Sequence, residues 1–559
     1  MKSSAATPRR ILWSIGGIAL LGAGFAFWLG GTFAGQPDPR TGYNAFYVLF
    51  ARDEVWGLGL LALFCFAGAM WFFREKRIEP SEISAGKHNH LFVACIAAGV
   101  FAIAALGTEF VCHNYALSAD EFMTNFQAQI FLRGEVTAEV PAKWLPALRV
   151  IKPTYVDYLP AKHAWKATYL PVYAAMRALF QSVYLQSFLN PFLAALTVLV
   201  LYATARNIWP NERQNALLAV FLLTGSAQFL VMAMTEYSMP AHLALNTIWL
   251  WLYSQPDRRR FYLAPVVGLL AIGLHQPIVH ALFVAPFLLR LVWQRRWRPV
   301  VIFGIIYSLG CTFWCAWRLH YATPAGQDIG TFLHFINFKM IAIQPMDLLL
   351  VLGWSCLATP LLFVLGLRRI FRERPILQDA AFSCLLTFGF YYFFYLDQGH
   401  GWGYRYFHGT LSCLVLVAVA GWESLGEKVG SRRARNFLGL GVAISLLFAL
   451  PLRCYEVETF VRPFARASHM IHSCDAQVVG LNPLDGWYSA DLIRNDPFLE
   501  DTPIVAAAVP GWMSPAEVQT LGRAGKTRFI GRDELAAVGL ATTPHNPKWM
   551  DPFHLGHAK

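Results

Sequence analysis

Two adjacent acidic residues, Asp120 and Glu121, begin a segment that could carry acid–base chemistry. Apolar side chains recur at helical spacing over 122–131, Ser118 is placed to cap the first turn, and Gly134 to end the helix. Two interpretations of the acids remain open. They could complement the positive end of the helix dipole, or a carboxylate there could accept a proton from an attacking hydroxyl. Spacing alone does not decide between them.

Three basic residues are candidates for binding an anion. Arg405 follows Gly401 and Gly403, which permit close approach of the backbone, and its guanidinium matches a phosphate through two hydrogen bonds. The alternative is an interfacial arginine that extends its charge toward water. Lys162 and Lys166 are secondary candidates, because flexible interfacial lysines commonly contact lipid headgroups.

The sequence offers little that could hold a metal. The closely spaced histidine pairs, His88 with His90 and His554 with His557, have no carboxylate or cysteine partners of the kind that zinc requires. We therefore expect a metal-independent protein without a cofactor. Of the ten cysteines, Cys454 and Cys474 could pair in an oxidising compartment, and their connectivity stays open.

The elements that must position these residues are membrane helices. Of the 559 residues, 56% are hydrophobic and only 14% are charged, whereas a soluble chain carries about 25% charged residues. Continuous apolar runs of about 18 to 23 residues recur between residues 11 and 452, long enough to cross the hydrocarbon core as helices. The formal net charge of +12 comes from basic clusters between these runs, so we expect no binding of nucleic acid.

The pattern predicts a polytopic α-helical membrane protein with about 13 transmembrane helices. The predicted spans are 11–33, 54–73, 91–109, 186–206, 215–233, 237–254, 261–275, 277–294, 299–318, 345–366, 379–396, 407–426 and 436–452. With a cytoplasmic N-terminus, the arginine-rich loops alternate onto one side, as the positive-inside rule requires. The large first outer loop, 110–185, and the tail then lie on the opposite side. This loop carries amphipathic surface helices.

We divide the chain into three parts. Residues 1–90 hold two extra N-terminal transmembrane helices and a cytoplasmic loop, and 91–452 form the transmembrane core. Charge rises from residue 453, where buried-strand patterns (476–481, 502–509 and 527–530) alternate with helix starts at Ser514 and Asp533. We expect 453–559 to form a small α/β domain outside the membrane.

Several motifs, taken together and in order, resemble those of the GT-C superfamily of membrane glycosyltransferases. The resemblance is closest to the branch of protein O-mannosyltransferases and aminoarabinose transferases. The acidic pair within 119–134 resembles the motif that begins the family's first outer loop. The other similar segments are 165–173 (WKATYLPVY), 190–197 (NPFLAALT), 235–242 (TEYSMPAH) and 399–407 (GHGWGYRYF). Two departures are the extra N-terminal spans and the Tyr-Leu-Pro-Val at 169–172, which lacks the family's second proline and its glycine.

The resemblance implies transfer of a sugar from a polyprenyl-phosphate-linked donor to an acceptor on the outer, periplasmic side of a bacterial inner membrane. Asp120 would be the general base, with Glu121 positioning it or the acceptor. The predicted substrate-binding residues are Arg405, Asp157, Lys162, Lys166, His242, His400 and Tyr404. Asp157 reads equally well as a solvated loop acid. The expected partners are the lipid donor, membrane lipids and a glycan, lipid or protein acceptor that the family does not identify.

The main alternative is a membrane transporter or lipid flippase, which would also show many spans. Such proteins tend to carry internal repeats and broken helices at the bilayer midplane. This sequence shows no internal repeat, and its polar clusters lie toward one surface. A scaffold that keeps the fold without the chemistry is a further alternative, and the intact acidic pair argues against it.

Overall fold

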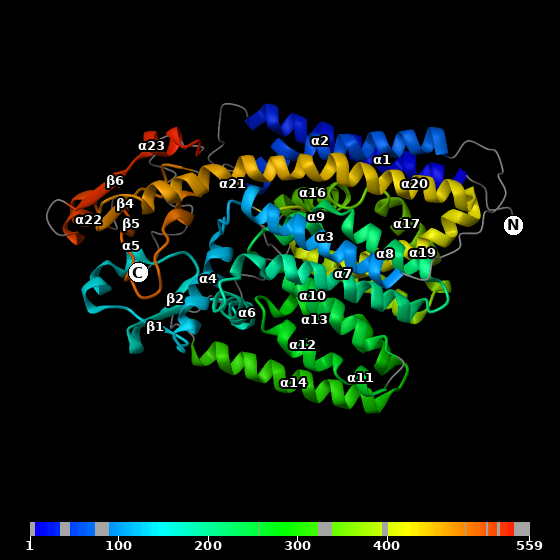
Figure 1. Cartoon of the computed structure of the whole chain (residues 1–559), viewed down its shortest axis with the longest axis horizontal. Coiled ribbons are helices and arrows are strands. Elements are labelled where there is room, and N and C mark those ends of the chain that lie inside the picture. The colour runs from blue at the N-terminus through cyan, green and yellow to red at the C-terminus, as the bar shows by residue number, and fades with distance from the viewer. Residues whose placement is uncertain are drawn as a thin grey trace.

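The computed structural model describes residues 6–33, 45–72, 89–255, 258–321, 338–393, 401–486, 488–509, 513–522 and 526–540. Within these residues the fold is an elongated bundle of helices with a smaller α/β region at one end (Figure 1). Seven of the described helices are long and apolar enough to cross a membrane, and up to nine when two bent pairs each count as one span. The polytopic helical fold is confirmed, while the count of about 13 spans stays a prediction.

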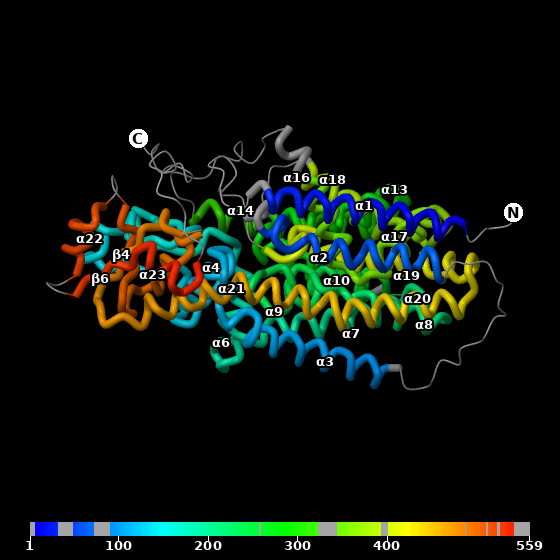
Figure 2. The backbone as a smooth tube through the Cα atoms, turned by 90° about the horizontal axis from the view of Figure 1, so that it is seen from above, coloured from blue at the N-terminus to red at the C-terminus, as the bar shows by residue number. Residues whose placement is uncertain are grey.

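The first half of the bundle is formed by the helices that precede and follow the outer loop in sequence. They are α1 (Ala6–Phe33), α2 (Ala45–Ala67) with the π-helical turn η1 (Gly68–Phe72), α3 (Asn89–Phe110), α7 (Leu189–Ile208) after the turn η4 (Gln186–Phe188), α8 (Arg213–Thr224), α9 (Ala227–Met234) and α10 (Met239–Tyr253). The two N-terminal helices pair with each other along one side of the bundle (Figures 1 and 2). Helices α8 and α9 form one of the bent pairs, with an angle of 58° between them.

The second half completes the bundle. Its elements are α11 (Arg258–Phe261), α12 (Ala264–Ile272), α13 (Pro277–Trp293), α14 (Trp297–His320), α16 (Phe338–Trp354), α17 (Thr359–Arg369), η5 (Ile370–Arg372), α18 (Pro375–Phe393), the 3-10 helix η6 (Arg405–Thr410) and α19 (Leu411–Val429). Helices α17 and α19 pack closely, because a Cβ at Gly421 would overlap the backbone of α17. Helix α14 lies at the rim of the bundle and is mostly exposed, as expected of a helix that faces lipid.

One long helix joins the bundle to the α/β region. Helix α20 (Ser431–Ile444), the π-helical turn η7 (Ser445–Ala449) and α21 (Leu450–His472) run on as a single element of 42 residues. At 1.5 Å per residue such a helix measures about 63 Å, twice the thickness of a hydrocarbon core of about 30 Å. The sequence-based span ending at 452, and the domain boundary after it, therefore fall within a continuous helix.

The C-terminal region is the small α/β domain that the sequence predicts. Strands β4 (Val478–Leu481), β5 (Ile504–Ala507) and β6 (Thr527–Ile530) form a parallel sheet in the order β5-β4-β6. The turn η8 (Ser489–Leu492) and the helices α22 (Pro515–Leu521) and α23 (Arg532–Ala537) connect or follow them. Ser514 caps α22 with Pro515 in its first turn, as its sequence pattern indicates.

The outer loop folds into helices around a second small sheet. Helix α4 (Ala119–Leu132) is followed by β1 (Ala138–Glu139), η2 (Ala142–Ala147), α5 (Leu148–Ile151), β2 (Val156–Leu159), η3 (Pro160–Lys162), β3 (Ala164–Ala167) and α6 (Val172–Gln181). The strands are antiparallel in the order β1-β3-β2. This compact unit covers the end of the bundle and lies beside the C-terminal domain (Figure 1).

A buried ion cluster attaches the N-terminal helices to the long helix. Arg453, which is 1% exposed, lies 2.7 Å from Glu54 and 2.8 Å from Glu456. Its guanidinium stacks 4.4 Å from the ring of Trp354, whose indole N–H donates to Glu54 at 2.7 Å. A Cβ at Gly57 would overlap the guanidinium, so glycine is needed there. The cluster fixes α2 against the helix that carries the C-terminal domain.

We expect Arg453→Met to destabilise the protein strongly, because it leaves two buried carboxylates without their cation. Removing one partner of a buried ion pair costs about 3–5 kcal/mol. Unfolding of the detergent-solubilised protein by dodecyl sulfate measures the effect. The matched control is Arg466→Met, at an exposed position of the same helix. Equal stability of the two variants would contradict a structural role for the cluster.

Candidate active site

Asp120 and Arg405, the strongest candidates for a base and for a phosphate-binding group, are in contact. Nη1 of Arg405 donates to Oδ2 of Asp120 at 2.8 Å, and the hydroxyl of Tyr169 donates to Oδ1. The ring of His275 lies against that of Tyr169, with 3.7 Å between their centroids and an angle of 36° between their planes. The side chains of Arg405 and Asp120 are only 7% and 14% exposed. A carboxylate is therefore held between a cation and a phenol in a site with limited access to water.

Local backbone geometry places Arg405. Gly403 adopts a positive φ of 60°, and a Cβ there would lie within 3 Å of the side chain of Gln228, so only glycine fits well. The amide of Gln228 donates to the carbonyl of Tyr404 at 2.7 Å and holds the turn. The guanidinium then lies 5.0 Å from the ring centroid of Tyr237 and 5.3 Å from that of Tyr406. These aromatic faces favour a cation between them.

The electrostatics of the site keep Asp120 ionised. Burial by itself would raise its pKa, but the charges of Arg405 and His275 and the hydrogen bonds from Tyr169 and Arg405 outweigh burial, so the pKa lies below its usual value. The carboxylate is thus available to accept a proton across the physiological pH range.

Glu121 holds the helix in place. Its carboxylate accepts from the backbone N–H of Ser118 at 3.0 Å and from the N–H of Glu236 at 2.9 Å, while Ser118 caps the N–H of Glu121. This is a capping box whose acid also ties α4 to the turn between α9 and α10. Of the two interpretations of the acidic pair, stabilisation of the helix start fits Glu121. The carboxylate of Asp120 instead contacts Arg405 and Tyr169.

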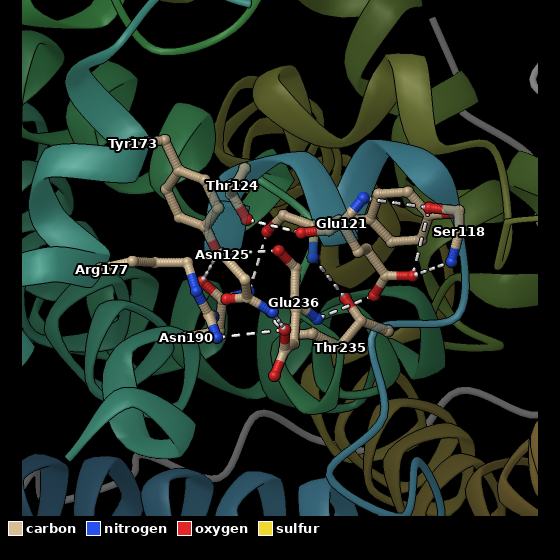
Figure 3. Close-up of polar contacts among 10 residues, drawn as sticks. Ser118, Glu121, Thr124, Asn125, Tyr173, Arg177, Asn190, Thr235 and Glu236 are labelled. Atoms are coloured by element: carbon tan, nitrogen blue, oxygen red, sulfur yellow. Dashed lines mark hydrogen bonds and ion pairs between the residues drawn. The ribbon is translucent and has the colours of Figure 1, made fainter. Parts of the chain in front are cut away.

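A buried polar network fixes that turn (Figure 3). Glu236 accepts from Asn125 at 2.6 Å and pairs with Arg177 at 3.0 Å. Asn190 donates to the carbonyls of residues 235 and 237 at 2.7 and 2.8 Å, and Tyr173 donates to Asn190 and to the carbonyl of Glu236. Because the partners lie on α4, α6 and α7, the network locks these three helices and the turn between α9 and α10 around the site.

The C-terminal domain contacts both ends of α4 through residues 491–500. At the start of α4, Oδ2 of Asp491 accepts from the N–H of Ala119 at 3.3 Å, and Arg494 donates to the carbonyl of Leu117 at 2.9 Å. At the other end, Arg133 pairs with Glu500 and lies 3.6 Å from the ring centroid of Phe498.

Further contacts join the 491–500 segment to the sheet of the outer loop. Trp165 donates to the carbonyl of Pro497 at 2.6 Å, and Asn495 donates to the carbonyl of Ile151 at 2.7 Å. No pattern in the sequence pointed to this segment. Its residues lie more than 300 positions from their partners, so no local pattern links them.

Titration of the acids at this contact predicts a pH-dependent stability. Burial raises the pKa of Asp491 to about 7, against the opposing effects of Arg494 and the N–H of Ala119. Burial likewise raises the pKa of Glu121 to about 7. Because the folded state favours the protonated acids, their contribution to stability is complete below the unfolded pKa of about 4 and is lost as the pH rises through 7.

We therefore expect the melting temperature in detergent to fall as the pH rises from about 4.5 to about 7.5 and to level off above that range. Asp491→Asn cannot ionise and should reduce the slope. Asp475→Asn, at an exposed position of the same domain, should keep it. An unchanged slope for Asp491→Asn would show that Asp491 is not the titrating group.

Asp157 and Lys166 form a pair with each other. They are directly opposite across β2 and β3, with the ammonium 3.2 Å from the carboxylate. Asp157 also accepts from Thr168 at 2.9 Å, and Lys166 donates to the carbonyl of Ala167 at 2.9 Å. Burial lowers the pKa of Lys166, although Asp157 opposes the shift. Lys166 lies three positions before Tyr169, so the pair braces the strand that leads to this tyrosine.

The remaining predicted residues are placed as follows. Lys162 is exposed, with its ammonium 5.2 Å from the ring of Tyr321. His242 is fully buried in the first turn of α10, and both of its ring nitrogens lack a hydrogen-bond partner among the described residues. The ring of Tyr404 is buried against Phe388. His400 lies outside the described residues.

Sequence reasoning missed several residues around Asp120. Tyr169 lies within the segment 165–173, but the pattern did not single it out. His275 lies at the break between α12 and α13, and Tyr237 lies in the turn that Asn190 holds. No group of three or more histidine, cysteine, aspartate or glutamate side chains with metal-binding geometry occurs within the described ranges. Metal independence stays a prediction.

Comparison with known proteins gives distant likenesses only. No family model and no curated protein matches the sequence. The chain is similar to ArnT from Cupriavidus metallidurans in the apo state, with a TM-score of 0.48, 12% identity and coverage of 79% of this chain and 89% of that one. For ArnT from the same organism bound to undecaprenyl phosphate, the values are 0.49, 13%, 73% and 85%.

A third similar structure is the arabinosyltransferase EmbB from Mycobacterium smegmatis, with a TM-score of 0.37, 13% identity and coverage of 75% of this chain and 36% of that one. These proteins are GT-C glycosyltransferases, the superfamily that the sequence motifs resemble. A fold can host many reactions, so the reaction of this chain has to follow from the chemistry of its site.

Proposed function

We propose that this protein is a GT-C-type glycosyltransferase that uses a polyprenyl-phosphate-linked sugar and acts at the outer face of the membrane. The observation that carries the proposal is the position of Asp120. Its carboxylate is ionised, nearly buried and in direct contact with Arg405, at the end of the bundle covered by the outer loop. A base beside a cation that fits phosphate is the minimum that this transfer requires.

In the proposed step, Asp120 accepts the proton of the acceptor nucleophile as that nucleophile attacks the anomeric carbon. The bond from this carbon to the phosphate oxygen breaks, and its electron pair leaves with the polyprenyl phosphate. Arg405 stabilises the charge that develops on the phosphate, which needs no separate proton donor. One base and one displacement give inversion at the anomeric carbon. No metal is required, because a guanidinium supplies the positive charge.

Arg405 would also adjust the basicity of Asp120. Its guanidinium lowers the pKa of the carboxyl group in the ion pair. A donor phosphate would share that guanidinium, weaken the ion pair and make Asp120 a stronger base when substrate is bound. Tyr169 keeps the carboxylate oriented while this exchange takes place.

The orientation follows from the arginine-rich loops, which place the N-terminus in the cytoplasm and the catalytic end in the periplasm. A bacterial inner membrane supplies polyprenyl phosphates on that side. The C-terminal domain would hold α4 in its catalytic position through the 491–500 segment. The acceptor, whether glycan, lipid or protein, has to be found by experiment.

The test is transfer of radiolabelled sugar in proteoliposomes supplied with a panel of polyprenyl-phosphate sugars and a membrane extract as the acceptor source. Undecaprenyl phosphate, the lipid bound in one ArnT structure, is the carrier to use first. We expect labelled product together with free polyprenyl phosphate. Movement of intact donor across the bilayer without release of polyprenyl phosphate would favour a flippase instead.

A further inference from the structure

A cavity of about 630 Å³ lies at the end of the bundle away from Asp120. It is bounded by the end of α10 with α11 on one side and by the start of α14 on the other. Its lining residues are Gln255, Arg259, Phe261, Tyr262, Arg296, Trp297, Arg298 and Pro299. The volume is within the range of small-molecule sites, about 300–1,000 Å³.

Among the residues that the structure describes here, the charged ones that line this cavity are the arginines 259, 296 and 298. The guanidinium of Arg296 lies 5.4 Å from the ring centroid of Phe261, which also lines the cavity. Three guanidinium groups around one cavity suit a phosphate, which they bind with paired hydrogen bonds.

The backbone at the start of α14 also favours an anion in this cavity. Helix α14 has 24 residues and begins at Trp297, so its first N–H groups and the positive end of its dipole are at the cavity. Trp297 and Tyr262 are the side-chain types that lie at the level of lipid headgroups.

The surface next to the cavity is that of a lipid-facing helix. Along α14 the apolar residues at every fourth position are exposed: Trp297 by 59%, Val301 by 55%, Ile305 by 56%, Leu309 by 65% and Phe313 by 56%. Residues four apart are neighbours on the helix surface, and each step advances about 40° around the axis, so these side chains form a continuous apolar stripe that starts at the cavity and winds around the helix. A free phosphate would make no use of the stripe, whereas acyl chains fit along it.

We propose that this cavity binds the phosphate headgroup of an anionic phospholipid, with its acyl chains against the exposed stripe of α14. The positive-inside rule places the site in the cytoplasmic leaflet, at the membrane face opposite to the catalytic one. The site is separate from the sugar-transfer chemistry, and it would remain if that chemistry proved different.

The test uses full-length protein purified in detergent and analysed by native mass spectrometry after addition of phosphatidylglycerol or phosphatidylethanolamine. We expect retention of phosphatidylglycerol over phosphatidylethanolamine. The triple variant Arg259→Gln, Arg296→Gln, Arg298→Gln should lose at least about tenfold of this affinity. The matched control is Arg432→Gln, Arg433→Gln, Arg435→Gln, which removes the same charge at the start of α20 and should bind as the wild type does.

Two results would overturn the proposal. One is equal loss in both triple variants, which would show a response to net charge alone. The other is displacement of phosphatidylglycerol by equimolar inorganic phosphate, which would show that the cavity binds a free anion without the acyl chains. The three cavity arginines are exposed, whereas Arg433 and Arg435 of the control are half-buried. Equal melting temperatures of the variants would verify that each is folded.

Discussion

Asp120→Asn should reduce sugar transfer by about 10²–10⁴-fold, the contribution typical of a general base. The amide keeps the size of the side chain and can still contact Tyr169, but it cannot take the proton of the acceptor. The effect should fall on kcat, with the KM for the donor nearly unchanged, because the lost interaction forms only in the transition state. Initial rates at varied donor concentration measure this split.

The control for Asp120→Asn is Glu139→Gln, an exposed acid of the same outer loop that lies in β1. It removes one negative charge from the same face of the protein and should keep wild-type rates. A variant at Asp120 that raises KM and leaves kcat intact would assign Asp120 to substrate binding and remove it from proton transfer.

Arg405→Gln should lower kcat/KM by about 10²–10³-fold, since it removes the group that stabilises charge on the leaving phosphate. Arg405→Lys should recover only part of the loss, because an ammonium lacks the planar fork that binds phosphate through two hydrogen bonds. Arg466→Lys, at an exposed position of α21, is the matched control and should behave as the wild type does.

The pH profile separates this role from a structural one. Arg405 contributes to the lowered pKa of Asp120, so without it the base should take up a proton at higher pH. The acidic limb of the rate profile should therefore move to higher pH in Arg405→Gln. A profile that falls in amplitude without moving would mean that the variant lowers the amount of folded enzyme and leaves the base unchanged.

Local signals in the sequence predicted the elements that depend on local physics. Ser118 caps α4 and Ser514 caps α22, because a hydroxyl before the first turn satisfies free N–H groups wherever the helix packs. The strand at 527–530 was equally clear from its pattern and flanking residues. The end of the long helix could not be predicted in this way. Residues 453–472 are more polar than a membrane span, so a search for apolar runs ends the helix near residue 452 although it continues.

The sequence predicted individual site residues, but it could not predict which of them contact one another. Asp120 and Arg405 are 285 positions apart, and Asp120 and Tyr169 are 49 apart, so only the folded chain brings them together. Asp491 is 372 positions from Ala119 and carries no motif. Glu121, predicted to position Asp120 or the acceptor, accepts hydrogen bonds from the N–H groups of Ser118 and Glu236 that hold the start of α4, and its part in catalysis stays a prediction.

The most direct test of the central claim is sugar transfer from a polyprenyl-phosphate donor by wild-type and Asp120→Asn proteoliposomes with equal amounts of folded protein. The account predicts labelled product and released polyprenyl phosphate from the wild type, and a residual rate from Asp120→Asn that is lower by at least about 10²-fold. Equal rates in the two preparations would contradict a catalytic base at Asp120. No product from either, across the donor panel, would contradict the proposed reaction.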